Sequence, residues 1–191
     1  MTFGVGVEGP SDFQFWDKVL HKYFRGCQFD VRNMKNRDKL IRETPRLLES
    51  FRDSHYAGGF ILVDLDDDPC IVSVLDLFDA TARQAARQGE RAGRYLHVCV
   101  AIKETESWYL ADTDAIQALI PGTKWQAPAD TGKVDKGKLR ALMRSRFGKH
   151  TAFNELAFAK DIAPKFSPQR AWPHSASFRY FWGTLESKVR Q

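Results

Sequence analysis

The stretch that most constrains the fold is residues 60–68, in which four apolar residues precede a cluster of aspartates. Its first four residues do not alternate between apolar and polar side chains, so the pattern predicts a strand that is buried on both faces of a sheet. The aspartates that follow are Asp64, Asp66, Asp67 and Asp68. Crowded carboxylates repel one another unless a cation offsets their charge, and their hard oxygen atoms suit Mg²⁺, Mn²⁺ or Ca²⁺. The stretch therefore predicts a buried strand that ends at a candidate metal site.

Apolar periodicity along the first two thirds of the chain predicts alternating strands and helices. Strands are expected at residues 3–7, 27–34, 60–63 and 95–102. Helical spacing of apolar residues falls between them, at residues 13–24, 40–51 and 71–89. Ser11 and Gln14 have the spacing of a capping box at the start of the first helix. Because parallel strands need crossover connections, this alternation predicts an α/β domain with a mostly parallel four-stranded sheet flanked by helices.

Acidic residues follow three of the four predicted strands. Glu8 follows the first strand, Asp64 and Asp66 follow the third, and Glu104 and Glu106 follow the fourth. Ligands of open α/β sheets gather at the carboxyl ends of the strands, so we expect these acids at one edge. The second strand is followed by no acid, which suits a strand at the margin of the sheet. The expected strand order is therefore 2-1-3-4.

The acids after the fourth strand have a second interpretation. Glu104 and Glu106 stand where a strand gives way to a helix, and the dipole at the amino end of a helix favours carboxylates. They are therefore either metal ligands or charges that stabilise the start of the helix. Trp108 and Leu110, which follow, are expected in the hydrophobic core.

The charge of the chain divides it into two parts. Residues 133–191 hold 13 Lys and Arg against 4 Asp and Glu, which leaves 16 against 20 in residues 1–132. We expect an α/β core at residues 1–120 and a basic helical extension packed on it at residues 121–191, where residues 121–135 form a surface loop. A basic region beside acids suits a polyanion, although a merely solvated helix face would have the same composition. The candidate nucleic-acid-binding residues are Lys136, Lys138, Arg140, Arg144 and Arg146.

Several other classes of protein lack support in the sequence. The three cysteines are too few and too widely spaced for a disulfide framework, and the five histidines lack the spacing of a zinc hydrolase. No Gly-x-Ser-x-Gly motif indicates a serine hydrolase. The amino terminus has no basic leader, and no apolar stretch reaches the roughly 18 residues that a membrane span needs. We expect a cytoplasmic protein with no membrane partner.

Three motifs in order resemble the Toprim-like fold. They are residues 8–12 (Glu-Gly-x-Ser-Asp), residues 63–66 (Val-Asp-Leu-Asp) and residues 104–112 (Glu-Thr-Glu-Ser-Trp-Tyr-Leu-Ala-Asp). The chain is most similar to small stand-alone Toprim-like proteins of bacterial defence loci, and distantly similar to the nuclease half of OLD-type (overcoming lysogenization defect) enzymes. Residues 175–181 also look like the end of such small proteins. The resemblance implies a Toprim- or Rossmann-like sheet.

The resemblance also implies a function. Glu8, Asp64 and Asp66 correspond to the metal-binding acids of the family, and Glu104 or Glu106 is a candidate ligand of a second ion. Two Mg²⁺ or Mn²⁺ ions about 3.5 to 4 Å apart would support hydrolysis of a phosphodiester bond of nucleic acid. The implied protein is a nuclease of phage defence whose ATPase partner is encoded separately. The chain itself has no Gly-x-x-x-x-Gly-Lys-[Ser/Thr] phosphate loop.

Two other functions remain open at this point. The Asp64-x-Asp66 pair after an apolar strand also resembles a haloacid-dehalogenase-type phosphatase, in which the first aspartate is the nucleophile. That motif normally opens its fold, whereas two strand–helix units precede it here. The other alternative is a non-catalytic module that binds metal or nucleic acid and regulates a partner.

Overall fold

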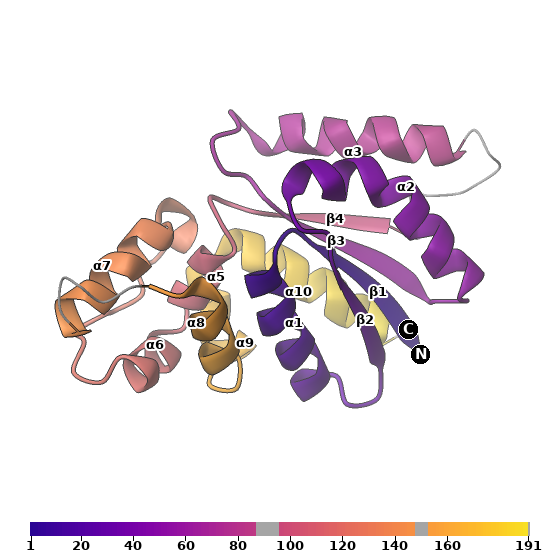
Figure 1. Cartoon of the computed structure of the whole chain (residues 1–191). Coiled ribbons are helices and arrows are strands. Elements are labelled where there is room, and N and C mark those ends of the chain that lie inside the picture. Colours follow the sequence, from indigo (N-terminus) through magenta and orange to yellow (C-terminus); the bar gives the residue numbers. More distant parts are fainter. Residues whose placement is uncertain (87–95, 148–152, 191) are drawn as a thin grey trace.

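The computed structural model describes residues 1–86, 96–147 and 153–190, with the backbone alone at residues 79–86, 146 and 147. A four-stranded sheet in the order β2-β1-β3-β4 forms its centre, and all neighbouring strands run parallel (Figure 1). The strands are β1 (Thr2–Val7), β2 (Gln28–Asn33), β3 (Gly58–Asp64) and β4 (Leu96–Ala101). The α/β class, the parallel sheet and the strand order are confirmed. Tyr95, predicted in the fourth strand, lies outside the described residues.

Helices cover both faces of the sheet. The helices α2 (Arg37–Asp53) and α3 (Ile71–Ala86) lie on one face, and α1 (Pro10–Tyr23) and α10 (Ala176–Val189) lie on the other (Figure 1). Phe60 and Leu62 of β3 belong to the hydrophobic cluster of the α1 side, whereas Ile61 and Val63 belong to that of the α2 side. The prediction that β3 is buried on both faces is confirmed. The expected end of the third helix near residue 89 lies outside the described residues.

The first helix begins earlier than its capping pattern predicted. Gly9 is the N-cap, Pro10 occupies the first helical position, and Asp12 Oδ2 accepts a hydrogen bond of 3.1 Å from the Gly9 N–H. Proline is well suited to this position because its fixed φ is helical and its missing N–H would have had no partner there. The capping box predicted for Ser11 and Gln14 is therefore wrong. As a result, Asp12 lies in the first turn of α1, four positions after Glu8.

The remaining helices are short and lie beyond the sheet. They are α5 (Glu106–Leu110), α6 (Thr113–Leu119), η1 (Thr131–Lys133), α7 (Lys136–Phe147), α8 (Glu155–Ile162), α9 (Pro168–Ala171) and η2 (Trp172–His174). Trp108 and Leu110 are fully buried, as predicted, and Trp108 stacks on Phe181 of α10 with ring centroids 5.4 Å apart. Residues from both sides of position 120 belong to one hydrophobic cluster. No helix within the described ranges has the length and apolar character that a bilayer crossing requires.

The loop at residues 121–135 is not confined to the surface. Trp125 is 7% exposed, and its Nε1–H donates a hydrogen bond of 3.0 Å to the carbonyl oxygen of Leu110. The Thr131 hydroxyl is buried and donates to the carbonyl oxygen of His174 at 3.0 Å. The surface-loop prediction was wrong at these two positions because proline and glycine content does not reveal a single anchoring aromatic residue. The anchored loop leads directly to the start of α7.

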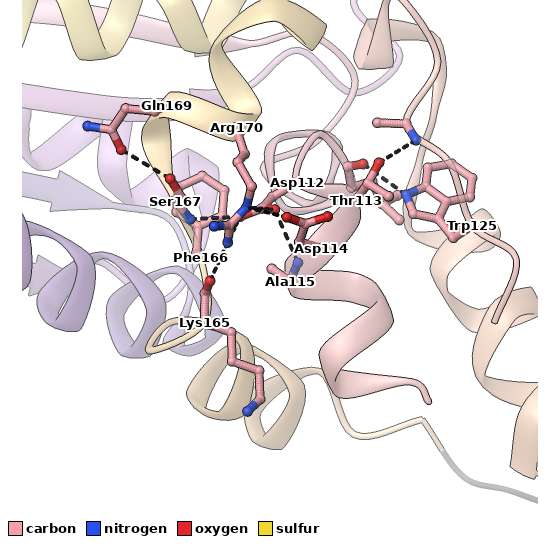
Figure 2. A network of polar contacts seen from close by, with 12 residues as sticks. Asp112, Thr113, Asp114, Ala115, Trp125, Lys165, Phe166, Ser167, Gln169 and Arg170 are labelled. Atoms are coloured by element: carbon pink, nitrogen blue, oxygen red, sulfur yellow. Dashed lines mark hydrogen bonds and ion pairs between the residues drawn. The ribbon is translucent and has the colours of Figure 1, made fainter. Parts of the chain in front are cut away.

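A buried aspartate fastens α6 to the segment before α9 (Figure 2). Asp112 caps α6 by accepting a hydrogen bond of 3.1 Å from the Ala115 N–H, and it also accepts one of 2.7 Å from the Ser167 N–H. Arg170 of α9 donates to both of its carboxylate oxygens, at 2.6 and 2.9 Å. The last residue of the motif at 104–112 therefore has a structural role.

Candidate functional site

A chain of hydrogen bonds joins three strand ends at the carboxyl edge of the sheet. Glu8, directly after β1, accepts a hydrogen bond of 2.7 Å at Oε1 from the backbone N–H of Asp64 at the end of β3. Asp64 Oδ1 in turn accepts bonds from the backbone N–H and the hydroxyl of Thr105, at 2.9 and 2.8 Å. The strand ends that the acids predicted to meet are therefore joined by hydrogen bonds. Thr105, which the sequence analysis did not single out, orients Asp64.

Two further carboxyl groups lie beside Glu8 and Asp64. Asp12 is 9% exposed and Glu106 is 6% exposed. The charge of Glu106 acts on both Asp12 and Asp64, and the charge of Glu8 acts on the same two groups. We call Glu8, Asp12, Asp64 and Glu106 the inner acidic cluster. Asp12 was missing from the predicted site, although an acid in the first turn of a helix that starts right after Glu8 was a signal for it.

The inner acidic cluster is poorly solvated, and its protons are held strongly. Burial is the main cause that raises the pKa of Glu8, Asp12 and Glu106 to about 7 each. Burial, followed by the charges of Asp12 and Glu8, raises the pKa of Asp64 well above its usual value. Clusters with pKa values raised in this way are common at functional sites, because catalytic acids and bases need pKa values that suit their task.

We expect the metal-free protein to lose stability as the pH rises from about 4.5 to about 7 through this cluster. The folded pKa values of Glu8, Asp12 and Glu106 lie near 7, above the ordinary values of 4.5 for Glu and 3.8 for Asp. The folded state therefore binds more protons than the unfolded state in this interval, and ionisation favours unfolding. Urea unfolding at pH 5 and pH 7.5 measures the loss. Glu106→Gln should make this pH-dependent loss of stability smaller, whereas Glu49→Gln on the surface of α2 should leave it unchanged. Equal pH dependence in the wild type and Glu106→Gln would contradict this account.

The other predicted acids lie around the inner acidic cluster rather than in it. Asp66 is exposed, has a left-handed backbone with φ of 50°, and has a pKa that burial and the charge of Glu104 raise. Glu104 is bound on both oxygens by Lys136, at 2.8 Å from the backbone N–H and 3.1 Å from Nζ. Asp67 is exposed, and Asp68 forms an ion pair with Arg37. Of the two glutamates after β4, Glu106 is therefore the one that joins the cluster.

The predicted nucleic-acid-binding residues of α7 do not form one free basic surface. Lys136 lies at the acidic edge, Lys138 Nζ lies 5.7 Å from the centroid of the Trp125 ring, and Arg140 pairs with Glu155. Arg144 is exposed, and the side chain of Arg146 lies outside the described residues. Burial alone would lower the pKa of Lys136, but the charges of Glu106 and Glu104 raise it above its usual value. Lys136 is thus the lysine of α7 whose charge acts on the inner acidic cluster.

The donor set suits a hard cation, although its present geometry is open. Glu8, Asp12 and Asp64 each use one carboxylate oxygen for the hydrogen bonds above, so the second oxygen of each receives none from the described residues. Tyr109 is buried beside this cluster, and its hydroxyl has no hydrogen-bond partner in the described part of the chain. Across the described ranges, however, no three His, Cys, Asp or Glu side chains are grouped closely enough to hold a metal ion. The residues fit Mg²⁺ or Mn²⁺ chemically, and binding would draw their free oxygens together.

Fold and site together define a parallel α/β domain with a cluster of buried and half-buried carboxyl groups at the carboxyl edge of its sheet. Residues 7–186 match the model of a family described as a domain of unknown function (DUF4276), and the chain belongs to this family. Comparison with curated proteins and with solved structures found no match. The likeness to Toprim-like and OLD-type proteins thus stays a prediction from the motifs.

Proposed function

We propose that this chain is a metal-dependent nuclease that hydrolyses phosphodiester bonds of nucleic acid at the inner acidic cluster. The observation that carries the proposal is the convergence of Glu8, Asp12, Asp64 and Glu106 from separate strand ends and from α1. The pKa values of Glu8, Asp12 and Glu106 are raised to about 7, and that of Asp64 is raised well above its usual value. Such a cluster is unfavourable for stability alone, because four buried or half-buried carboxyl groups share the same small region. Binding of a divalent cation would remove that cost.

Glu8, Asp64 and Asp66 are the residues that would hold the cation, with Asp12 or Glu106 as further ligands. A bound Mg²⁺ or Mn²⁺ supplies an activated water at neutral pH and stabilises charge on the phosphate. The role of the chain is to orient these carboxylates. Thr105 holds one oxygen of Asp64 with two hydrogen bonds, and the Asp64 N–H holds one oxygen of Glu8.

Lys136 would stabilise negative charge at the same place. Its ammonium group is held by Glu104 at 3.1 Å, and its charge acts on Glu8, Asp12 and Asp66. A fixed cation beside the reacting phosphate contributes to catalysis because it needs no reorganisation during the reaction. The motifs further support a cytoplasmic role in phage defence, with ATP hydrolysis supplied by a separate partner chain.

Metal removal tests the proposed activity. The purified chain should cleave fluorescently labelled DNA or RNA oligonucleotides in Mn²⁺ or Mg²⁺, lose this activity in EDTA, and regain it when the metal is restored. Calorimetric titration with Mn²⁺ should show binding that Glu8→Gln weakens by about 10- to 100-fold. Cleavage that persists unchanged in EDTA, or in the Glu8→Gln protein, would contradict the proposal.

A non-catalytic binding module is the second candidate, and the open geometry of the acids favours it. Within the described residues, no three acids lie close enough together to hold an ion. Glu104 already forms an ion pair with Lys136. Such a module would bind nucleic acid in a salt-dependent manner without cleaving it, and the binding would survive Glu8→Gln. Trapping of a phosphorylated Asp64 with a small phosphomonoester would instead indicate a phosphatase.

A further inference from the structure

One ion pair crosses the sheet edge directly over the acidic site. Arg37 is the first residue of α2, just after β2, and Asp68 lies in the loop after β3. The two side chains form an ion pair. Because β1 lies between β2 and β3, a contact that joins these two connections passes across the carboxyl end of β1, where Glu8 lies. The ion pair thus holds Arg37 near the carboxyl end of β1, where its charge acts on Glu8.

The guanidinium group of Arg37 keeps hydrogen-bonding capacity after it has paired with Asp68. Asp68 contacts one terminal nitrogen, whereas Nε is buried and has no hydrogen-bond partner among the described residues. The side chain is 21% exposed, so it is held in place yet open to solvent on one side. Because Nε is enclosed, the terminal N–H groups that Asp68 leaves free are those that can meet a ligand. A fixed planar guanidinium matches the oxygens of a phosphate group better than a lysine does.

Arg37 and Lys136 stand on opposite sides of the acidic edge. Lys136 is fixed by Glu104 on the β4 side, and Arg37 is fixed by Asp68 over β1. Both positive charges lower the pKa of Glu8 and of Asp66, so both act on the same carboxyl groups. A nucleic-acid strand that approaches these acids would be repelled without such cations. The pair therefore brackets the place where a phosphodiester would lie.

We infer that Arg37 binds a phosphate group of the nucleic-acid strand beside the acidic site, and that Asp68 is the positioning residue that orients its guanidinium. This inference rests on the proposed function for its ligand but concerns binding rather than cleavage. It adds α2 to a contact surface that the sequence placed on α7 alone.

The test is the salt dependence of binding to a labelled 20-nucleotide single strand and to its duplex, measured by fluorescence anisotropy in EDTA. Loss of one phosphate contact should reduce the slope of log K against log salt by about one. Arg37→Gln should show this reduction. Arg37→Lys keeps the charge, so it should keep the slope while it weakens binding. Arg46→Gln is the matched control, because Arg46 lies on the same helix and its side chain is 84% exposed.

The outcomes separate this inference from the proposed function. A slope that is equal in the wild type, Arg37→Gln and Arg46→Gln would overturn the inference, even if the wild type cleaves nucleic acid. Absence of measurable binding of the wild type to both probes would overturn it as well. A slope that depends on Arg37 in a protein without cleavage activity would support it and count against the nuclease. Matching circular dichroism and melting curves would exclude misfolding of Arg37→Gln.

Discussion

Asp64→Asn is expected to reduce metal-dependent phosphodiester cleavage by about 10²- to 10³-fold, the size of effect that follows removal of one group that stabilises transition-state charge. An asparagine oxygen can still accept the two hydrogen bonds that Thr105 donates to Asp64 Oδ1. The substitution therefore removes the negative charge and keeps the local geometry. Because burial already raises the pKa of Asp64 well above its usual value, the variant should be at least as stable as the wild type.

The matched control for this variant is Asp67→Asn. Asp67 follows the same strand three positions later, is exposed, and lies outside the inner acidic cluster. Both variants replace one aspartate of the same loop by asparagine, so a general effect of losing a carboxyl group at this edge would appear in both. Initial rates in Mn²⁺ at saturating substrate, with melting temperatures measured in parallel, provide the comparison. Equal activity of the two variants would show that Asp64 does not take part in the reaction.

Much of the sheet could be predicted because its signals are local. The unbroken apolar run at residues 60–63 indicated a strand buried on both faces, and the acids that follow three strands indicated which strand lies at the margin. Both were confirmed, because β3 faces two hydrophobic clusters and β2 lies at one edge of the sheet. Alternation and strand-end chemistry depend on neighbouring residues, so they can be read without knowledge of the packing.

The membership of the inner acidic cluster depends on information that the sequence pattern lacks. Only Thr105 separates Glu104 from Glu106, and a pattern cannot tell which of the two glutamates turns inward at the start of α5. The structure buries Glu106 and pairs Glu104 with Lys136, which is 32 positions away. That pairing depends on the path of the loop before α7, which Trp125 anchors in the core. Asp12 was missed for a simpler reason, since the true N-cap Gly9 shifts the helix start toward Glu8.

Asp112→Ala is expected to lower the free energy of unfolding by about 2 to 4 kcal/mol, from the loss of a helix cap and of partners for buried N–H groups. Asp112 is fully buried and accepts bonds from the N–H groups of Ala115 and Ser167 as well as from Arg170 (Figure 2). Alanine leaves both backbone donors without a partner, and the fixed contact between α6 and α9 is lost.

The matched control for this last prediction is Asp114→Asn, which changes a second carboxylate beside the same arginine. Asp114 lies 3.5 Å from Arg170 Nε, but its side chain is 69% exposed, so its ion pair should contribute less than about 1 kcal/mol. Urea unfolding followed by tryptophan fluorescence measures both variants. A large loss for Asp112→Ala with little change for Asp114→Asn would show that buried hydrogen bonds, rather than the charge of Arg170, hold α6 against the segment before α9. Similar losses in the two variants would instead assign the stabilisation to the charge of the arginine.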